Sequence, residues 1–71
     1  MAAADPVVVN ARGMKCPWPA LRAARAMREA DAIEIEADDP IAGRELEALA
    51  VQHGWQFIVI APHRFALIHK G

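Results

Sequence analysis

The chain has 71 residues, 55% of them apolar, and a net charge of −1. A chain of this size is expected to form one domain, residues 1–71, that buries about 60% of the surface its unfolded form exposes. Cys16 is the only cysteine, so a disulfide within the chain is excluded. No apolar run approaches the roughly 20 residues of a membrane helix, and we expect no membrane partner. A free cysteine without a signal segment predicts a cytoplasmic protein, with residues 1–6 flexible.

The first elements in chain order are a strand and a helix. Residues 7–9 are β-branched and predict a buried strand, which Gly13 then breaks. Residues 17–30 predict a helix with apolar residues at helical spacing, and we expect Leu21 and Met27 to face the core.

A second strand and helix follow. Residues 32–37 alternate as a half-exposed strand, with Ile33 and Ile35 on one face. Asp39 is a candidate N-cap and Pro40 a candidate first helical residue. The helix should reach residue 53, with Gly54 as its C-cap. Its expected buried residues are Ile41, Leu46, Leu49 and Ala50.

Two strands complete the chain. Residues 57–61 are apolar on both faces and predict an inner strand, and residues 65–69 alternate as the last strand. The order β-α-β-α-β-β predicts an α/β two-layer sandwich. With right-handed crossovers, both helices cover one face of a four-stranded mixed sheet.

The charges are divided along the chain. Residues 29–47 hold eight acids and one base, whereas residues 11–28 hold no acid and five bases: Arg12, Lys15, Arg22, Arg25 and Arg28. The last three recur every three residues and form a basic stripe along the predicted helix. The stripe indicates either a solvated face or a docking surface for a partner.

Cys16 follows the first strand and precedes the first helix, at the sheet edge where α/β proteins place their sites. A helix N-terminus and nearby cations, here Arg12 and Lys15, lower the pKa of a thiol. If Cys16 is the N-cap, Pro19 removes one of the N–H groups that would bind the thiolate. The prolines would also hold the sulfur in one place. The alternative is that Cys16 is a small apolar core residue.

Several chemistries lack the residues they require. A dithiol cycle needs a second cysteine, and the three histidines do not have metal-ligand spacing, so no metal site is expected. No histidine is placed as a base for Cys16, and there is no Gly-rich phosphate loop. A single activated thiolate, which attacks or carries a group, remains.

Three stretches support a family resemblance: ARGMKCPWPALRAARAM, EIEADDPIAGRELEALA and FALIHKG. They resemble the TusA-like (SirA/YedF/TusA) sulfur-carrier family, whose hallmark is Cys-Pro-x-Pro after an Arg-Gly turn. Met14 stands where the family usually has leucine. The resemblance implies the same β-α-β-α-β-β fold. It also implies a carrier, rather than a stand-alone turnover enzyme, that holds sulfur as a covalent persulfide on Cys16 without a cofactor.

The resemblance also implies partners and supporting residues. The donor protein would be of the cysteine desulfurase or rhodanese type, and an acceptor protein would receive the sulfur. Trp18, in the variable slot of the motif, is expected to contact partners together with Arg22 and Arg25. Asp39 is either a helix cap or part of the site, because both family motifs would lie at one sheet edge. The expected supporting residues are Arg12, Gly13, Lys15, Pro17, Pro19, Asp39 and Pro40.

A second function class stays open. The basic face of the first helix would also suit a non-catalytic regulatory module that binds protein or RNA. The sequence pI of about 6.3 argues against direct nucleic-acid binding, since such domains are usually basic.

Overall fold

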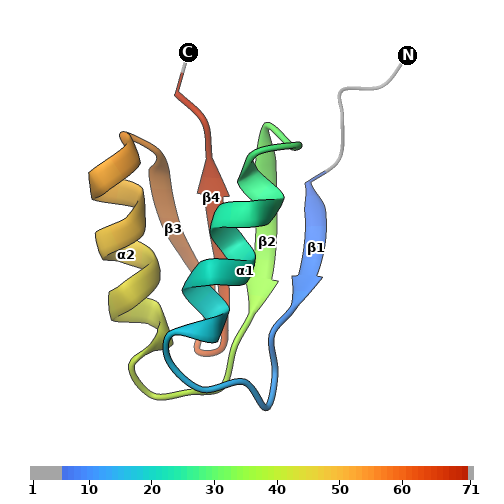
Figure 1. The fold of residues 1–71 in the computed structure, drawn as a ribbon, viewed down its shortest axis with the longest axis vertical. Coiled ribbons are helices and arrows are strands. Elements are labelled where there is room, and N and C mark those ends of the chain that lie inside the picture. The colour runs from blue at the N-terminus through green and yellow to red at the C-terminus, as the bar shows by residue number, and fades with distance from the viewer. Residues whose placement is uncertain (1–5, 71) are drawn as a thin grey trace.

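The computed structural model describes residues 6–70, and residues 1–5, which include most of the segment expected to be flexible, lie outside that range. Two helices cover one face of a four-stranded sheet (Figure 1). The predicted two-layer α/β sandwich is therefore confirmed. Its elements are β1 (Val7–Asn10), α1 (Trp18–Met27), β2 (Ala32–Glu36), α2 (Ala42–His53), β3 (Gln56–Ala61) and β4 (Arg64–Ile68).

The strand order in the sheet is β1-β2-β4-β3. β1 and β2 are parallel, and β4 is antiparallel to both β2 and β3. The prediction of an inner strand at residues 57–61 is wrong, because β4 takes the inner position and β3 the edge. Ile58, Val59 and Ile60 are exposed as a result. Apolar composition alone does not tell which strand of a hairpin pairs with β2.

The core lies between the sheet and the helix layer. Ile33 and Ile35 are fully buried, which confirms the predicted alternation of β2. They pack with Met27, Leu46 and Leu67 from the other elements. At Gly43 the first turn of α2 lies so close to β4 that an added Cβ would sit 3.0 Å from the ring of Phe65.

Three residues that the sequence placed in the core, one on α1 and two on β1, are exposed. Val7 and Val8 of β1 are 48% and 59% exposed, and Val9 is buried. β1 is an edge strand, and Val8, which pairs with Glu34, lies on the sheet face opposite the helices. Leu21 is 52% exposed. α1 turns Pro19, Ala23 and Met27 toward the sheet, which leaves Leu21 on the outer side of the helix.

α2 begins later than predicted. Its N-cap is Ile41, which is exposed rather than buried, and Asp39 and Pro40 form a turn before the helix. Leu46 and Ala50 are buried as expected, and Leu49 is partly buried. Gly54 ends the helix with φ of 73°, a left-handed conformation that glycine adopts without strain, so the predicted C-cap is confirmed.

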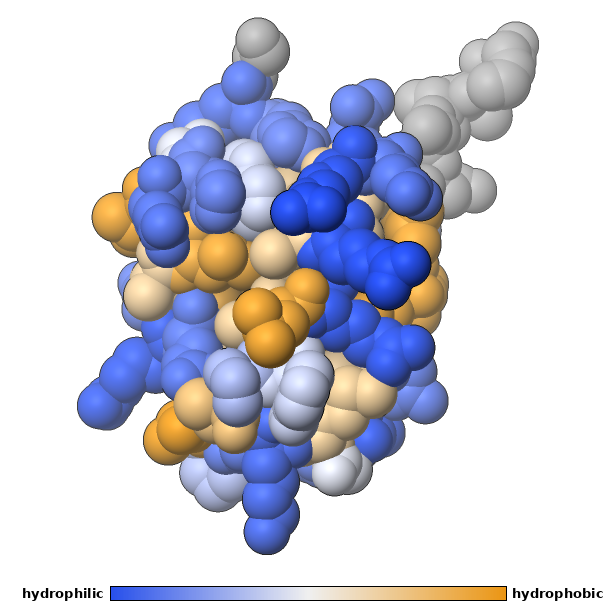
Figure 2. Space-filling model, viewed as in Figure 1, coloured by the Kyte–Doolittle hydropathy of each residue, from blue (hydrophilic) through white to orange (hydrophobic). Residues whose placement is uncertain are grey.

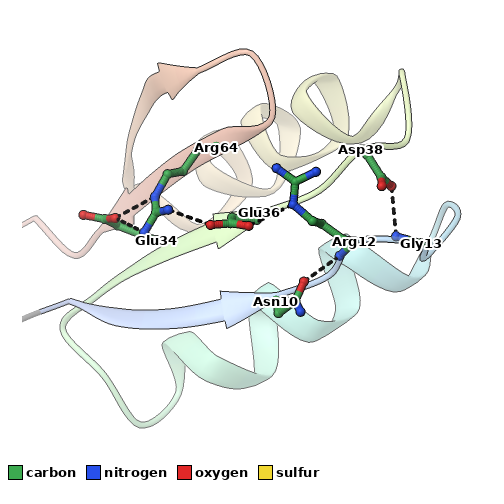
Figure 3. A network of polar contacts seen from close by, with 7 residues as sticks. All are labelled: Asn10, Arg12, Gly13, Glu34, Glu36, Asp38 and Arg64. Atoms are coloured by element: carbon green, nitrogen blue, oxygen red, sulfur yellow. Dashed lines mark hydrogen bonds and ion pairs between the residues drawn. The ribbon is translucent and has the colours of Figure 1, made fainter.

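The sheet face opposite the helices carries a chain of ion pairs (Figure 3). Arg64 of β4 lies between two carboxylates of β2 and contacts Glu34 at 2.9 Å and Glu36 at 2.6 Å. Arg12 contacts the other oxygen of Glu36 at 2.9 Å. We call these four residues the sheet-face network.

Candidate functional site

Two loops meet at one end of the sheet. Because β1 and β2 are parallel, the loops that follow them leave the same edge. Asp38 accepts a hydrogen bond from the backbone N–H of Gly13 at 2.9 Å, as Figure 3 shows. Asp39 accepts one from the backbone N–H of Cys16 at 2.9 Å. The two carboxylates thus hold the cysteine loop against the loop after β2.

Gly13 gives the cysteine loop its turn. Its φ is +79°, in the left-handed region where residues with a Cβ are strained. Glycine at this position therefore follows from backbone conformation, because an added Cβ would meet no atom within 4 Å.

Asp39 ties three segments of the site together. Besides Cys16, its side chain accepts a hydrogen bond from the N–H of Ile41 at 3.0 Å, and its carbonyl accepts one from the N–H of Ala42. These backbone hydrogen bonds, from Ile41 first and Cys16 second, hold the pKa of Asp39 below its usual 3.8, and the charge of Lys15 adds to them. The N-cap of α2 is Ile41, so the hydrogen bonds of Asp39 close the turn before the helix and link that turn to the cysteine loop.

Cys16 is partly exposed and stands just before α1. The residue at the N-cap is Pro17, and no side chain caps this helix end, so the prediction of a cysteine N-cap is wrong. Pro17 is exposed and follows a cis peptide bond, whereas Pro19 is buried. Cys16 does not belong to the core cluster, which argues against its being a simple core residue.

The closest charged partner of the thiol is Glu45 in the first turn of α2. Cys16 Sγ donates a hydrogen bond to Glu45 Oε2 at 2.5 Å. This hydrogen bond, followed by burial and then by the charges of Glu45 and Asp39, raises the pKa of Cys16 from 9.0 to about 11. The sequence led us to expect a lowered pKa, so that expectation is wrong for the free protein.

The two expected cations do not contact the thiol. Arg12 turns to the sheet face, where its Nε donates to Glu36. Lys15 is exposed, and its charge acts on Asp39. A position next to Cys16 in sequence therefore does not bring a cation onto its sulfur.

Sequence reasoning missed Glu45. A weak signal was present: Glu45, Ala48, Leu49 and Gln52 recur at helical spacing and line one side of α2. In the structure this strip lines a shallow pocket together with Pro17, Ala20 and Leu21 from the N-terminal end of α1. Glu45 is the first residue of this strip. An acid at that position was a candidate contact for a residue at the N-terminal end of α1, where Cys16 lies.

A shallow groove lies on the outer side of α1, and Met14 of the cysteine loop lines one part of it. It has a volume of about 500 Å³ and is lined by Met14, Trp18, Leu21, Arg22 and Arg25. We call it the Trp18 groove. Trp18 is 61% exposed, and all the arginines of the basic stripe are exposed as well. Figure 2, which views the helix layer, shows strongly hydrophilic side chains in a row beside hydrophobic ones.

Other types of site lack support within residues 6–70. No group of three His, Cys, Asp or Glu side chains in that range has a metal-binding arrangement. None of the helices described there is long and apolar enough to cross a membrane.

Comparison with known proteins identifies a family and a solved structure of the same fold. A protein-family model described as Sulfurtransferase TusA matches residues 7–68. The crystal structure of a SirA-like protein from Desulfitobacterium hafniense superimposes with a TM-score of 0.76, at 20% identity over 92% of this chain and 99% of that chain. At that identity the likeness supports the fold alone. No curated protein matches the chain in a sequence comparison.

Proposed function

Because the chain belongs to the TusA family of sulfurtransferases, we propose that it relays sulfane sulfur as a persulfide on Cys16. The observation that carries this proposal is the placement of the only cysteine. It lies partly exposed in the Cys-Pro-x-Pro segment, at the sheet edge where both loops of the site meet. The protein acts as a cytoplasmic carrier without a cofactor, rather than as an enzyme that turns over alone.

The transfer requires no external oxidant or reductant. The sulfur of Cys16 attacks the outer sulfur of a cysteine persulfide on the donor protein. A new S–S bond forms on Cys16, the donor's S–S bond breaks, and the donor leaves as a thiolate that takes up the proton lost by Cys16. The same exchange in the opposite sense passes the sulfur to a thiol of the acceptor. The thiolate is the attacking form in each exchange.

The Trp18 groove is our proposed docking surface for the donor and acceptor. Its exposed tryptophan is the type of side chain that anchors protein interfaces. Arg22 and Arg25 beside it would steer an acidic partner face toward Cys16. Leu21, which sequence reasoning assigned to the core, belongs to this surface.

Intact-protein mass spectrometry tests the proposal. Wild type and Cys16→Ser are incubated with a cysteine desulfurase and cysteine, and separately with a rhodanese and thiosulfate. We expect wild type to gain one sulfur atom, reversibly on reduction, and Cys16→Ser to gain none. Loading of Cys16→Ser to the wild-type level, or no gain by folded wild type with either donor, would contradict the proposal.

The second candidate is a regulatory module that binds RNA through the basic stripe. The exposure of Arg22, Arg25 and Arg28 along one helix favours it. Fluorescence polarisation with labelled RNA at two salt concentrations tests it, because phosphate contacts make binding strongly salt-dependent. Absent or salt-independent binding would exclude it.

A further inference from the structure

We propose that Glu45 is a positioning residue that keeps Cys16 protonated, and so unreactive, in the free carrier. A donor must then separate the two side chains or neutralise Glu45 before the thiolate forms. The inference rests on the proposed function: a carrier that should accept sulfur only from a docked donor benefits from a thiol that is protonated and unreactive until the donor binds.

The contact between the two side chains is the first support. Glu45 Oε2 accepts the thiol proton of Cys16, and a carboxylate in this position stabilises the S–H form and repels a thiolate. Losing that proton would place two negative charges side by side.

The second support is that the charge of Glu45 is uncompensated. Its other oxygen, Oε1, is buried and has no hydrogen-bond partner. The ion pairs found within residues 6–70 all belong to the sheet-face network, and none includes Glu45. Among the described residues, therefore, no paired cation weakens the effect of Glu45 on the sulfur.

The other charged groups near the thiol do not offset the negative charge of Glu45. Asp39, on the loop after β2, adds a second negative charge near Cys16. Lys15, on the cysteine loop, acts on Asp39. The residues at the N-terminal end of α1 that line the same shallow pocket as Glu45 are uncharged: Pro17 at the N-cap, Ala20 and Leu21. The balance at the sulfur is therefore negative, which agrees with the raised pKa of the thiol.

Alkylation of the free protein by iodoacetamide, followed across pH, tests the inference. In Glu45→Gln the side chain keeps its size and loses its charge, so the thiol should titrate at least one pH unit lower. Alkylation near neutral pH should then be about tenfold faster or more. Glu47→Gln is the matched control, because it makes the same change at an exposed position of α2 and should react as wild type does.

An unchanged pH profile in folded Glu45→Gln would overturn the inference. If circular dichroism shows that this variant does not fold, Glu45→Asp replaces it. The shorter side chain keeps the charge but withdraws it from the sulfur, so a severalfold faster reaction is expected, and a wild-type rate would overturn the inference. The assay uses no sulfur donor. A failure of persulfide loading with the alkylation shift intact therefore contradicts the proposed function alone.

Discussion

The sheet-face network and the cysteine site place their charges in opposite ways. On the sheet face, Arg64 and Arg12 each contact a carboxylate of β2, so the acids there are paired. At the cysteine site, Glu45 contacts a thiol and pairs with no cation of residues 6–70, and the arginines of the Trp18 groove are exposed. Paired charges contribute to stability, whereas an unpaired charge is available to a reacting group or a partner. The comparison therefore separates residues that stabilise the fold from residues that are available for the proposed sulfur exchange.

The largest expected effect on stability is that of Arg64→Ala. Without the guanidinium of Arg64, Glu34 and Glu36 lie on one strand face with no shared cation. We expect the midpoint of thermal unfolding to fall by about 5 °C. Circular dichroism during heating measures it. Arg25→Ala, which removes an exposed arginine, should stay within about 2 °C of wild type. Equal midpoints for the two variants would contradict the assignment of the network to stability.

A smaller effect is expected on donor binding. Arg25→Ala removes a charge from the Trp18 groove and should weaken binding of a sulfur donor about fivefold at low salt. The loss should shrink as salt screens the interaction. Titration calorimetry measures both. Arg44→Ala makes the same charge change on α2, outside the groove, and comparable weakening by Arg44→Ala would show that only net charge matters.

The smallest expected effect is a pH dependence of the network. Hydrogen bonding from Arg12, together with the charges of Arg64 and Arg12, lowers the pKa of Glu36 below 4.5 against the opposing effect of burial. A lowered pKa in the folded state adds stability above the unfolded value, and that stability is lost as the pH falls through the folded value. The difference in the free energy of unfolding between wild type and Arg12→Ala should therefore decrease as the pH is lowered.

Urea unfolding at a pH of about 6 and of about 3 measures that difference. The stability gap between wild type and Arg12→Ala should narrow at the lower pH. The gap between wild type and Arg28→Ala, which removes a cation from the basic stripe, should not change. A constant gap for Arg12→Ala would show that the ion pair with Glu36 does not contribute to stability in solution.

Local patterns in the sequence determined much of the fold. The alternation around Ile33 and Ile35 assigned β2, and Gly54 marked the end of α2, because both signals depend only on neighbouring residues. The position of Cys16 between a strand and a helix was likewise readable, and the segment around it indicated the family. Parallel β1 and β2 followed from the order of elements, which placed Asp39 at the same edge as Cys16.

Tertiary structure alone decided which groups meet. Local pattern does not specify that β4, rather than β3, pairs with β2, since both strands of the hairpin are apolar. It also does not specify that Arg12 turns to Glu36 while Glu45, 29 residues from Cys16, contacts the thiol. Charge acts through distance in space, and only the packing of α2 against α1 fixes that distance. The raised pKa of Cys16 is therefore a property of the folded chain, even though its sequence neighbours are basic.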